Sequence, residues 1–445
     1  MITYSIIQKS QLEGSHRLDA EYYQPEYLDI IKNLNKLKAI PIKEIAINPK
    51  RKFRPKIGEF FQYIEISEVD LLTGEYNKAE ILGENVPDRA QWIVKKDDVI
   101  ISTVRPIRNA VSLIRKDINN LVCSSGFAVL KTKKVEPEYL FVYLKSKPIV
   151  KLLDRKTTAT MYPAITVDDI LETKIYLGNQ KFRDEIKNQV IEAQKNLEQS
   201  KSFYSQAESL LLEELGLKDF KPVEDLTYIV NLSDLKSSHR IDAEYFQPKY
   251  KKIIERVKKY KLKLLGDLVL MKKGFEPGSG EYQNEGKLFI RVSNISRFGF
   301  TDKDQKYLNN ELYQQLKSNF EPKIRDILLT KDATPGIAYV LKGPVEGIIA
   351  SGIMRLKIKE DIDAEYLALC INSLVCQMQI ERDAGGSVIV HWKPEQIKNL
   401  LIPILPQPTQ QKIADLVRKS HEARKKAKEL LEEAKQKVEM MILGK

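Results

Sequence analysis

The chain has 445 residues, of which 42% are hydrophobic and 30% are charged. This length exceeds what one ordinary core organises, so we expect at least two domains, and the apolar share excludes a largely disordered chain. Lys and Arg number 73 against 61 Asp and Glu, and this net charge of +12 favours a polyanionic partner without excluding an ordinary basic protein.

Three cysteines, Cys123, Cys370 and Cys376, are spread through the chain. This odd, sparse count argues against a secreted disulfide framework, so we expect buried, reduced thiols. The first ten residues have neither a basic start nor a long apolar stretch, and no segment approaches the length of a membrane span. We therefore expect a cytoplasmic protein with no membrane contact.

One 13-residue segment occurs twice, at 15–27 and at 238–250. It is SHRLDAEYYQPEY in the first copy and SHRIDAEYFQPKY in the second, with ten of the thirteen positions identical. Fainter echoes follow in the same order, among them 98–101 with 326–329 and 138–140 with 365–367. Short β-branched runs predict strands, and the stretches near 138–154 and 365–381 predict helices. The chain is thus predicted to hold two copies of one α+β unit.

A long helix is predicted after each copy, because apolar or small residues recur at alternating steps of four and three, which is a heptad seam. The seam residues are Ile186, Val190, Ala193, Leu197, Tyr204, Ala207, Leu211, Ile413, Val417, Ala427, Leu431, Ala434 and Val438. Arg424 interrupts the second seam once. If a pseudo-two-fold relates the copies, the helices pair antiparallel as a spacer of about 50 Å. The alternative is that each helix packs only on its own unit.

The doubled segment followed by heptad helices resembles the specificity subunit of type I restriction–modification enzymes, over essentially the whole chain. The resemblance implies target recognition domain 1 at 1–178, a spacer helix at 179–217, target recognition domain 2 at 218–405 and a C-terminal spacer helix at 406–445. The expected fold class is α+β, with two similar target-recognition domains in pseudo-two-fold arrangement, separated by an antiparallel pair of long coiled-coil helices.

The resemblance also implies partners. Each domain would read one half of a bipartite site on double-stranded DNA. The helices would set the unread spacer and dock two methyltransferase subunits, and motor-nuclease subunits would join them. Methylation and cleavage would belong to those partners, so no catalytic residue, cofactor or metal is expected in this chain.

The residues themselves agree with a non-catalytic interpretation. No Pro-Pro pair exists for a methyltransferase loop, and the nearest approach to a P-loop, Gly280 to Lys287, fails on spacing. Four scattered histidines do not make a zinc site, and His16 and His239 in the repeat are interpreted as packing residues. The alternatives are a self-contained methyltransferase or nuclease with an unrecognised motif, and a coiled-coil scaffold without DNA contact.

Candidate DNA contacts are the basic and polar residues in loops that differ between the copies, because phosphates attract Lys and Arg while Arg and Asn pair with base edges. In the first copy they are Arg51, Lys52, Arg54, Arg105, Arg108, Asn109, Arg155, Lys156, Thr157 and Tyr162. In the second copy they are Lys272, Lys273, Lys331, Arg382, Ser387, His391 and Lys393. Different side chains on a repeated frame are what two different half-sites require. The alternative for each loop is ordinary solvated surface.

Overall fold

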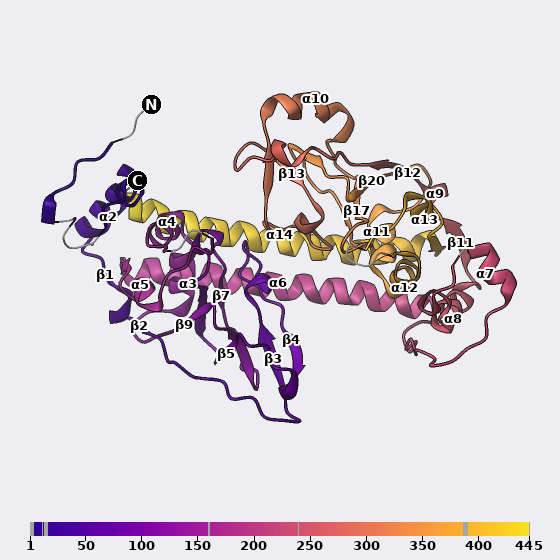
Figure 1. Ribbon diagram of the computed structural model, residues 1–445, viewed down its shortest axis with the longest axis horizontal. Helices are drawn as coiled ribbons and strands as arrows, with labels where there is room; N and C mark the ends of the chain where they lie inside the picture. The colour runs from indigo at the N-terminus through magenta and orange to yellow at the C-terminus, as the bar shows by residue number, and fades with distance from the viewer. Residues whose placement is uncertain are drawn as a thin grey trace. The chain divides into compact units, whose positions relative to one another are not determined.

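The computed structural model describes residues 4–10, 12, 17–158, 161–238, 240–385 and 390–444 (Figure 1). The chain divides into unit 1, Met1–Asn196 with Lys425–Lys445, and unit 2, Leu197–Arg424. The two long helices, α6 (Gln180–Glu214) and α14 (Gln407–Leu443), each contribute one half to unit 1 and the other half to unit 2. Our sequence boundaries instead treat these helices as separate segments.

Unit 1 contains two four-stranded sheets. The first has the order β2 (Ala46–Ile47), β9 (Phe127–Thr132), β6 (Asp98–Ser102), β7 (Val111–Leu113), and the second β4 (Ala79–Leu82), β3 (Phe60–Ile64), β8 (Leu121–Ser124), β5 (Ala90–Ile93). A short pair joins β1 (Ile40–Pro41) to β10 (Lys174–Ile175). The helices before α6 are α2 (Pro25–Lys36), α3 (Pro137–Lys145), α4 (Lys147–Arg155) and α5 (Val167–Leu171).

Unit 2 repeats this plan. Its four-stranded sheet has the order β12 (Val269–Lys273), β20 (Ile353–Ile358), β17 (Ile327–Thr330), β18 (Ala338–Val340), and a three-stranded sheet has the order β16 (Lys306–Leu308), β13 (Lys287–Ile290), β19 (Gly347–Ile349). Two further pairs are β11 (Lys261–Leu264) with β21 (Leu401–Ile404), and β14 (Ile295–Ser296) with β15 (Gly299–Phe300). The helices are α7 (Leu232–Ser238), α8 (Pro248–Val257), α9 (Leu265–Leu268), α10 (Asn310–Phe320), α11 (Ala364–Asn372), α12 (Leu374–Asp383) and α13 (Pro394–Lys398).

The matching strands confirm that both copies fold as the same α+β unit. β6 and β17 are the matched strands 98–101 and 326–329 of the repeat, and every residue of each is buried. Val, Ile and Leu side chains suit this position, because a strand covered on both faces needs apolar groups on both. β3 pairs parallel with β8 in unit 1, and β13 pairs parallel with β19 in unit 2. Helix α10, which follows β16 and packs against β19, is an element that the repeat did not predict.

The two long helices run antiparallel inside each unit (Figure 1, magenta and yellow). In unit 1, Glu185 pairs with Lys437 at 2.5 Å and Glu192 with Lys426 at 2.6 Å, so residue numbers fall along α14 as they rise along α6. In unit 2, the Oγ atoms of Ser200 and Ser420 lie 3.1 Å apart. All thirteen seam side chains predicted from the heptads are buried. Arg424, which interrupts the seam, is also buried, with its Cζ 4.7 Å from the ring centre of Phe298.

The buried serine pair gives a first prediction. Ser420 donates to the backbone oxygen of Ser200 at 2.7 Å, and its hydroxyl also meets that of Ser200. Ser420→Ala alone is expected to cost about 1 kcal/mol, because it leaves the Ser200 hydroxyl short of a partner in an apolar seam. The double change of Ser200→Ala with Ser420→Ala should cost less than the two single changes added together. Urea unfolding of the four proteins measures this cycle, and strict additivity would contradict it.

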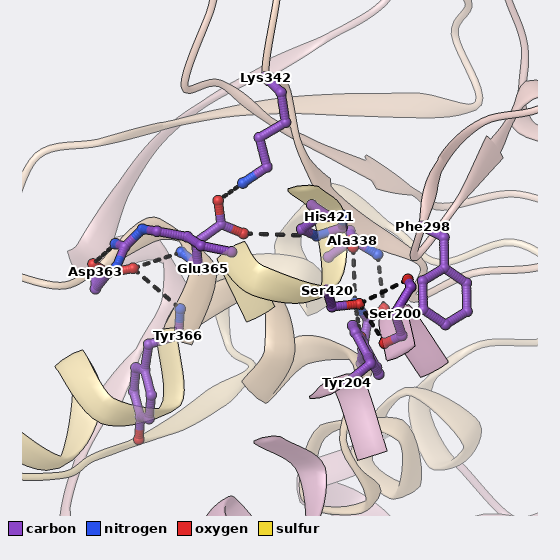
Figure 2. Close-up of polar contacts among 12 residues, drawn as sticks. Ser200, Tyr204, Phe298, Ala338, Lys342, Asp363, Glu365, Tyr366, Ser420 and His421 are labelled. Carbon is purple, nitrogen blue, oxygen red and sulfur yellow. Dashed lines mark hydrogen bonds and ion pairs between the residues drawn. The ribbon is translucent and has the colours of Figure 1, made fainter. Parts of the chain in front are cut away.

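An acidic residue is buried where α11 meets α14 (Figure 2). The Glu365 side chain is 6% exposed and forms an ion pair with Lys342, while its other oxygen lies 3.9 Å from Nε2 of His421. Unit 1 has a matching pair of Arg115 with Glu138 at 2.6 Å. In both units a carboxylate on the first helix after the central sheet therefore meets a cation that follows the matched strand β7 or β18.

His421 makes the stability of unit 2 depend on pH. Burial, together with the charges of Lys342 and Arg424, lowers the pKa of His421 to about 3. An unfolded His binds a proton near pH 6.5, so the unfolded state holds the extra proton and stability is lost as pH falls from about 6.5 towards 3. Unfolding at pH 5 should require roughly 2 kcal/mol less than at pH 7.5 from this residue.

The control is His421→Gln, because Gln194 occupies the matched position of α6. The chain has two Trp residues, Trp92 and Trp392, one in each unit, so urea unfolding followed by Trp392 fluorescence in a Trp92→Phe background reports on unit 2. An equally steep loss of stability at low pH in His421→Gln would show that another group is responsible.

Among the helices of the described residues, none combines the length and apolar character of a membrane span. All three cysteine thiols are buried and unbridged. Burial raises the pKa of each, which keeps the thiols protonated and unreactive.

Candidate nucleic-acid interface

Two loops of unit 1 that carry predicted contacts are joined by their backbones. The strand-end loop, residues 103–110, follows β6, and the bridge loop, residues 156–165, follows α4. Ala164 forms β-bridges with both Val104 and Thr158, and the backbone N–H of Arg105 donates to the Pro163 oxygen at 2.7 Å. Arg105 adopts a left-handed backbone with φ 49°, which turns the chain sharply after the strand.

This junction brings two predicted contacts together. The Cζ of Arg105 lies 5.4 Å from the ring centre of Tyr162, which is exposed. Arg108 is exposed in the same strand-end loop. Asn109 is turned inward instead, since its amide donates to the Lys145 oxygen at 2.9 Å. The half-buried Arg105 and the exposed Arg108 and Tyr162 thus form a cationic and aromatic surface, a combination that suits bases and phosphates.

The matching loops of unit 2 are its strand-end loop, residues 331–337 after β17, and its bridge loop, residues 384–392 after α12, and they are joined in the same way. His391 forms β-bridges with both Asp332 and Gly385, and the Trp392 N–H donates to the Lys331 oxygen at 2.9 Å. Ser387 lies outside the described residues.

Lys331, Asp332 and His391 form a chain of hydrogen bonds at this second junction, which we call the polar relay. The buried Lys331 donates to Asp332 at 2.6 Å, and Asp332 meets Nδ1 of His391 at 2.8 Å. Burial opposes ionisation of Asp332, but the hydrogen bonds from Lys331 and His391 outweigh it and lower the pKa of that carboxyl. The His391 side chain is 59% exposed, so the relay ends in an orientated imidazole at the surface. Lys393, two residues later, is exposed as well.

The basic loop of unit 1, residues 50–56, lies at the other end of β6. Arg51 forms an ion pair with Asp98, the first residue of β6, whereas Arg105 follows the last. Burial raises the pKa of Asp98 despite the opposing charge of Arg51. Lys52 and Arg54 are exposed. Arg51 therefore pairs with a buried carboxylate, whereas Lys52 and Arg54 are the cations of this loop that face solvent.

Lys272 and Lys273 were predicted in a loop, but they are the last two residues of strand β12. Lys273 is exposed, and Lys272 donates to Asn319 on α10 at 2.9 Å. The strand runs further here than β2 does in unit 1, so the basic residues of the two copies occupy different places.

Four other predicted contacts make internal bonds. Lys156 donates to the backbone oxygen of Asp169 at 2.7 Å, and the Thr157 hydroxyl donates to the backbone oxygen of Asp154 at 2.8 Å. Arg155 and Arg382 stack on tyrosines of the repeated segment. Sequence reasoning missed Asp332 as the residue that orientates His391, although it stands next to Lys331 in a loop that we singled out. His16 and His239 lie outside the described residues.

Residues 257–436 match the family model of the type I restriction modification DNA specificity domain. A curated relative, the type I restriction enzyme HindI specificity subunit of Haemophilus influenzae, is 25% identical over 149 residues, which are 32% of this chain and 32% of the relative. Residues 257–436 thus resemble a type I restriction modification DNA specificity domain. The matched residues lie mostly in unit 2, and unit 1 has the same repeated segment and sheet order.

Two solved structures align with most of the chain. The HsdS subunit from Thermoanaerobacter tengcongensis is 21% identical with a TM-score of 0.33, covering 91% of this chain and 94% of that one. The S subunit from M. genitalium is 14% identical with a TM-score of 0.38 and the same coverage. The alignment with the curated relative spans about a third of that relative's length.

Proposed function

We propose that this chain is the DNA-sequence-specificity subunit of a type I restriction–modification complex, with each unit reading one half of a bipartite duplex site. The observation that carries the proposal is the repeated junction of two loops. It presents Arg105, Arg108 and Tyr162 in unit 1 but His391 and Lys393 in unit 2. One frame with different exposed side chains is suited to two different base sequences.

The side chains divide by their chemistry. A guanidinium such as that of Arg105 or Arg108 offers paired donors to the O6 and N7 of guanine, and so would specify bases. Lys52, Arg54 and Lys273 would hold phosphates, which fixes the register of the protein without reading sequence. In this proposal Arg51, Asn109, Lys156, Thr157, Lys272 and Lys331 support the surface from within.

The chain would work with partners that supply the chemistry. Two methyltransferase subunits would dock on the polar outer faces of α6 and α14, and motor-nuclease subunits would join that assembly. The chain itself would need no cofactor. Within the described residues, no group of three His, Cys, Asp or Glu side chains could hold a metal ion.

The test is selection from random duplexes by the full chain with its modification subunits. We expect enrichment of one split motif with an unread spacer of constant length, bound more weakly as salt rises. Changes at Arg105 or Arg108 should alter base preference in one half of the motif only. Enrichment of no motif, or methylation or cleavage by the purified chain alone with a methyl donor or Mg²⁺, would contradict the proposal.

A further inference from the structure

The repeated segment builds the same cluster of arginine and tyrosine in both units. In unit 1, Arg17 binds Asp19 through Nε at 2.6 Å and through a terminal nitrogen at 2.8 Å. The Cζ of Arg17 lies 4.9 Å from the ring centre of Tyr22, and the Cζ of Arg155 lies 3.7 Å from that same ring. Arg155 also donates to the Tyr22 backbone oxygen at 2.5 Å. The Tyr22 ring thus makes cation–π contacts with two guanidinium groups.

Unit 2 repeats the arrangement with the matching residues. Arg240 binds Asp242 through Nε and through a terminal nitrogen, and its Cζ lies 4.8 Å from the ring centre of Tyr245. Arg382 lies 5.4 Å from the same centre and binds Asp383 at 2.7 Å. We call these two groups the Arg–Tyr–Arg clusters: Arg17, Tyr22 and Arg155 in unit 1, and Arg240, Tyr245 and Arg382 in unit 2.

Each cluster lies where a bridge loop begins. Arg155 is the last residue of α4, and Arg382 is the penultimate residue of α12, so the bridge loop follows at once in both units. The far end of each loop runs into a short helix, α5 or α13. The hydrogen bonds around Asp169 cap α5, and Gln396 in α13 donates back to the Asp383 oxygen at 2.6 Å. Helix and cluster together fix both ends of the loop.

Aspartates pair with one guanidinium of the unit 1 cluster, Arg17, and with both guanidinium groups of the unit 2 cluster. The side-chain hydrogen bond from Arg17 lowers the pKa of Asp19 to about 2, and Arg240 lowers the pKa of Asp242 in the same way. A guanidinium that already stacks on a ring and donates to the chain has fewer donors left for phosphate.

We propose that Arg155 and Arg382, with Tyr22 and Tyr245, are positioning residues that hold the end of the bridge loop nearest to them in each unit, so that base reading depends on them although they do not themselves contact DNA. This inference rests on the proposed function. It accounts for the near-identity of the segment in both copies, because the anchor of a loop can be shared by units that read different bases.

The test uses the full chain with its modification subunits and the split motif selected by the wild type. Tyr22→Leu removes the ring, and Arg155→Met removes the guanidinium. Both are expected to reduce discrimination against wrong bases about tenfold in the half-site read by unit 1. The slope of log affinity against log salt should stay unchanged, because no phosphate contact is lost. Tyr22→Phe, which keeps the ring, is the matched control and should behave as wild type.

Tyr245→Leu should have the same effect on the opposite half-site only. Arg155→Lys keeps the charge but loses the planar stack, so it should relax base preference as Arg155→Met does. A salt slope that is shallower by about 0.9 in Arg155→Met, with wild-type discrimination in Tyr22→Leu, would show that Arg155 contacts a phosphate and would overturn the inference. Full discrimination in Arg155→Lys would overturn it as well. Failure of the wild-type complex to select a motif would instead contradict the proposed function itself.

Discussion

Replacing Lys342 by Met is expected to lower the free energy of unfolding of unit 2 by about 3 kcal/mol, because it leaves the buried carboxylate of Glu365 without its cation. The Glu365 side chain is 6% exposed, so water cannot take the place of the ammonium group. His421 is a poor replacement, because burial, the largest cause of its lowered pKa, and the charge of Arg424 still oppose protonation of that ring when Lys342 is absent. Urea unfolding followed by Trp392 fluorescence in a Trp92→Phe background measures the loss.

Two controls separate charge from packing. Lys342→Arg recreates the Arg115–Glu138 pair of unit 1, and we expect it to cost under about 1 kcal/mol. Glu365→Gln should also cost less than Lys342→Met, because the Lys342 side chain is 34% exposed and its charge can turn to water. A Lys342→Met protein as stable as the wild type would show that the pair contributes little to unit 2.

Reversing the charges of Lys52 and Arg54 to Glu is expected to weaken duplex binding on the order of 100-fold at physiological salt. Each removed phosphate contact should make the salt slope shallower by about 0.9, so a change of about 1.8 is expected for the pair. The base preference of both half-sites should be unaffected, because phosphate contacts carry no sequence information. Titration of the full complex with its split motif at several salt concentrations measures both quantities.

Arg51 is left unchanged in this experiment, because its loss would leave the buried Asp98 without its ion-pair partner, and an effect on folding could then be mistaken for one on binding. The matched control reverses Lys32 and Lys36, two exposed residues of α2, and so makes the same change in net charge. Equal weakening in both variants would indicate a general effect of net charge, and would argue against a phosphate contact at the basic loop.

The sequence predicted the architecture well because the patterns that indicate it are periodic or repeated. The doubled segment predicted two similar units, and the heptad residues that were predicted to be buried are buried. Helix α10 was missed because it belongs to one unit alone and has no echo in the other. The sharing of each long helix between both units was also missed, because a heptad pattern locates a seam but not the body to which each half belongs.

The site was harder to predict than the fold. A run of basic residues shows where charge is, but the partner of each charge lies far away in the sequence. Arg155 stacks on Tyr22, more than a hundred residues earlier, and Arg51 meets Asp98. The loops that differ between the copies included those that meet at the junctions around Ala164 and His391. They could not distinguish a side chain that faces outward from one that holds the loop in place.

The division of the long helices bears on the order in which the protein folds during synthesis. Unit 2 is one continuous stretch, Leu197–Arg424, whereas unit 1 needs Lys425–Lys445 from the far end of the chain. At a translation rate of about 5 to 20 residues per second, the apolar side chains of Ile186, Val190 and Ala193 remain without their partners on α14 for about 10 to 50 s. We therefore expect the nascent chain to expose an unpaired apolar helix to chaperones that act at the ribosome until Lys425–Lys445 has been translated.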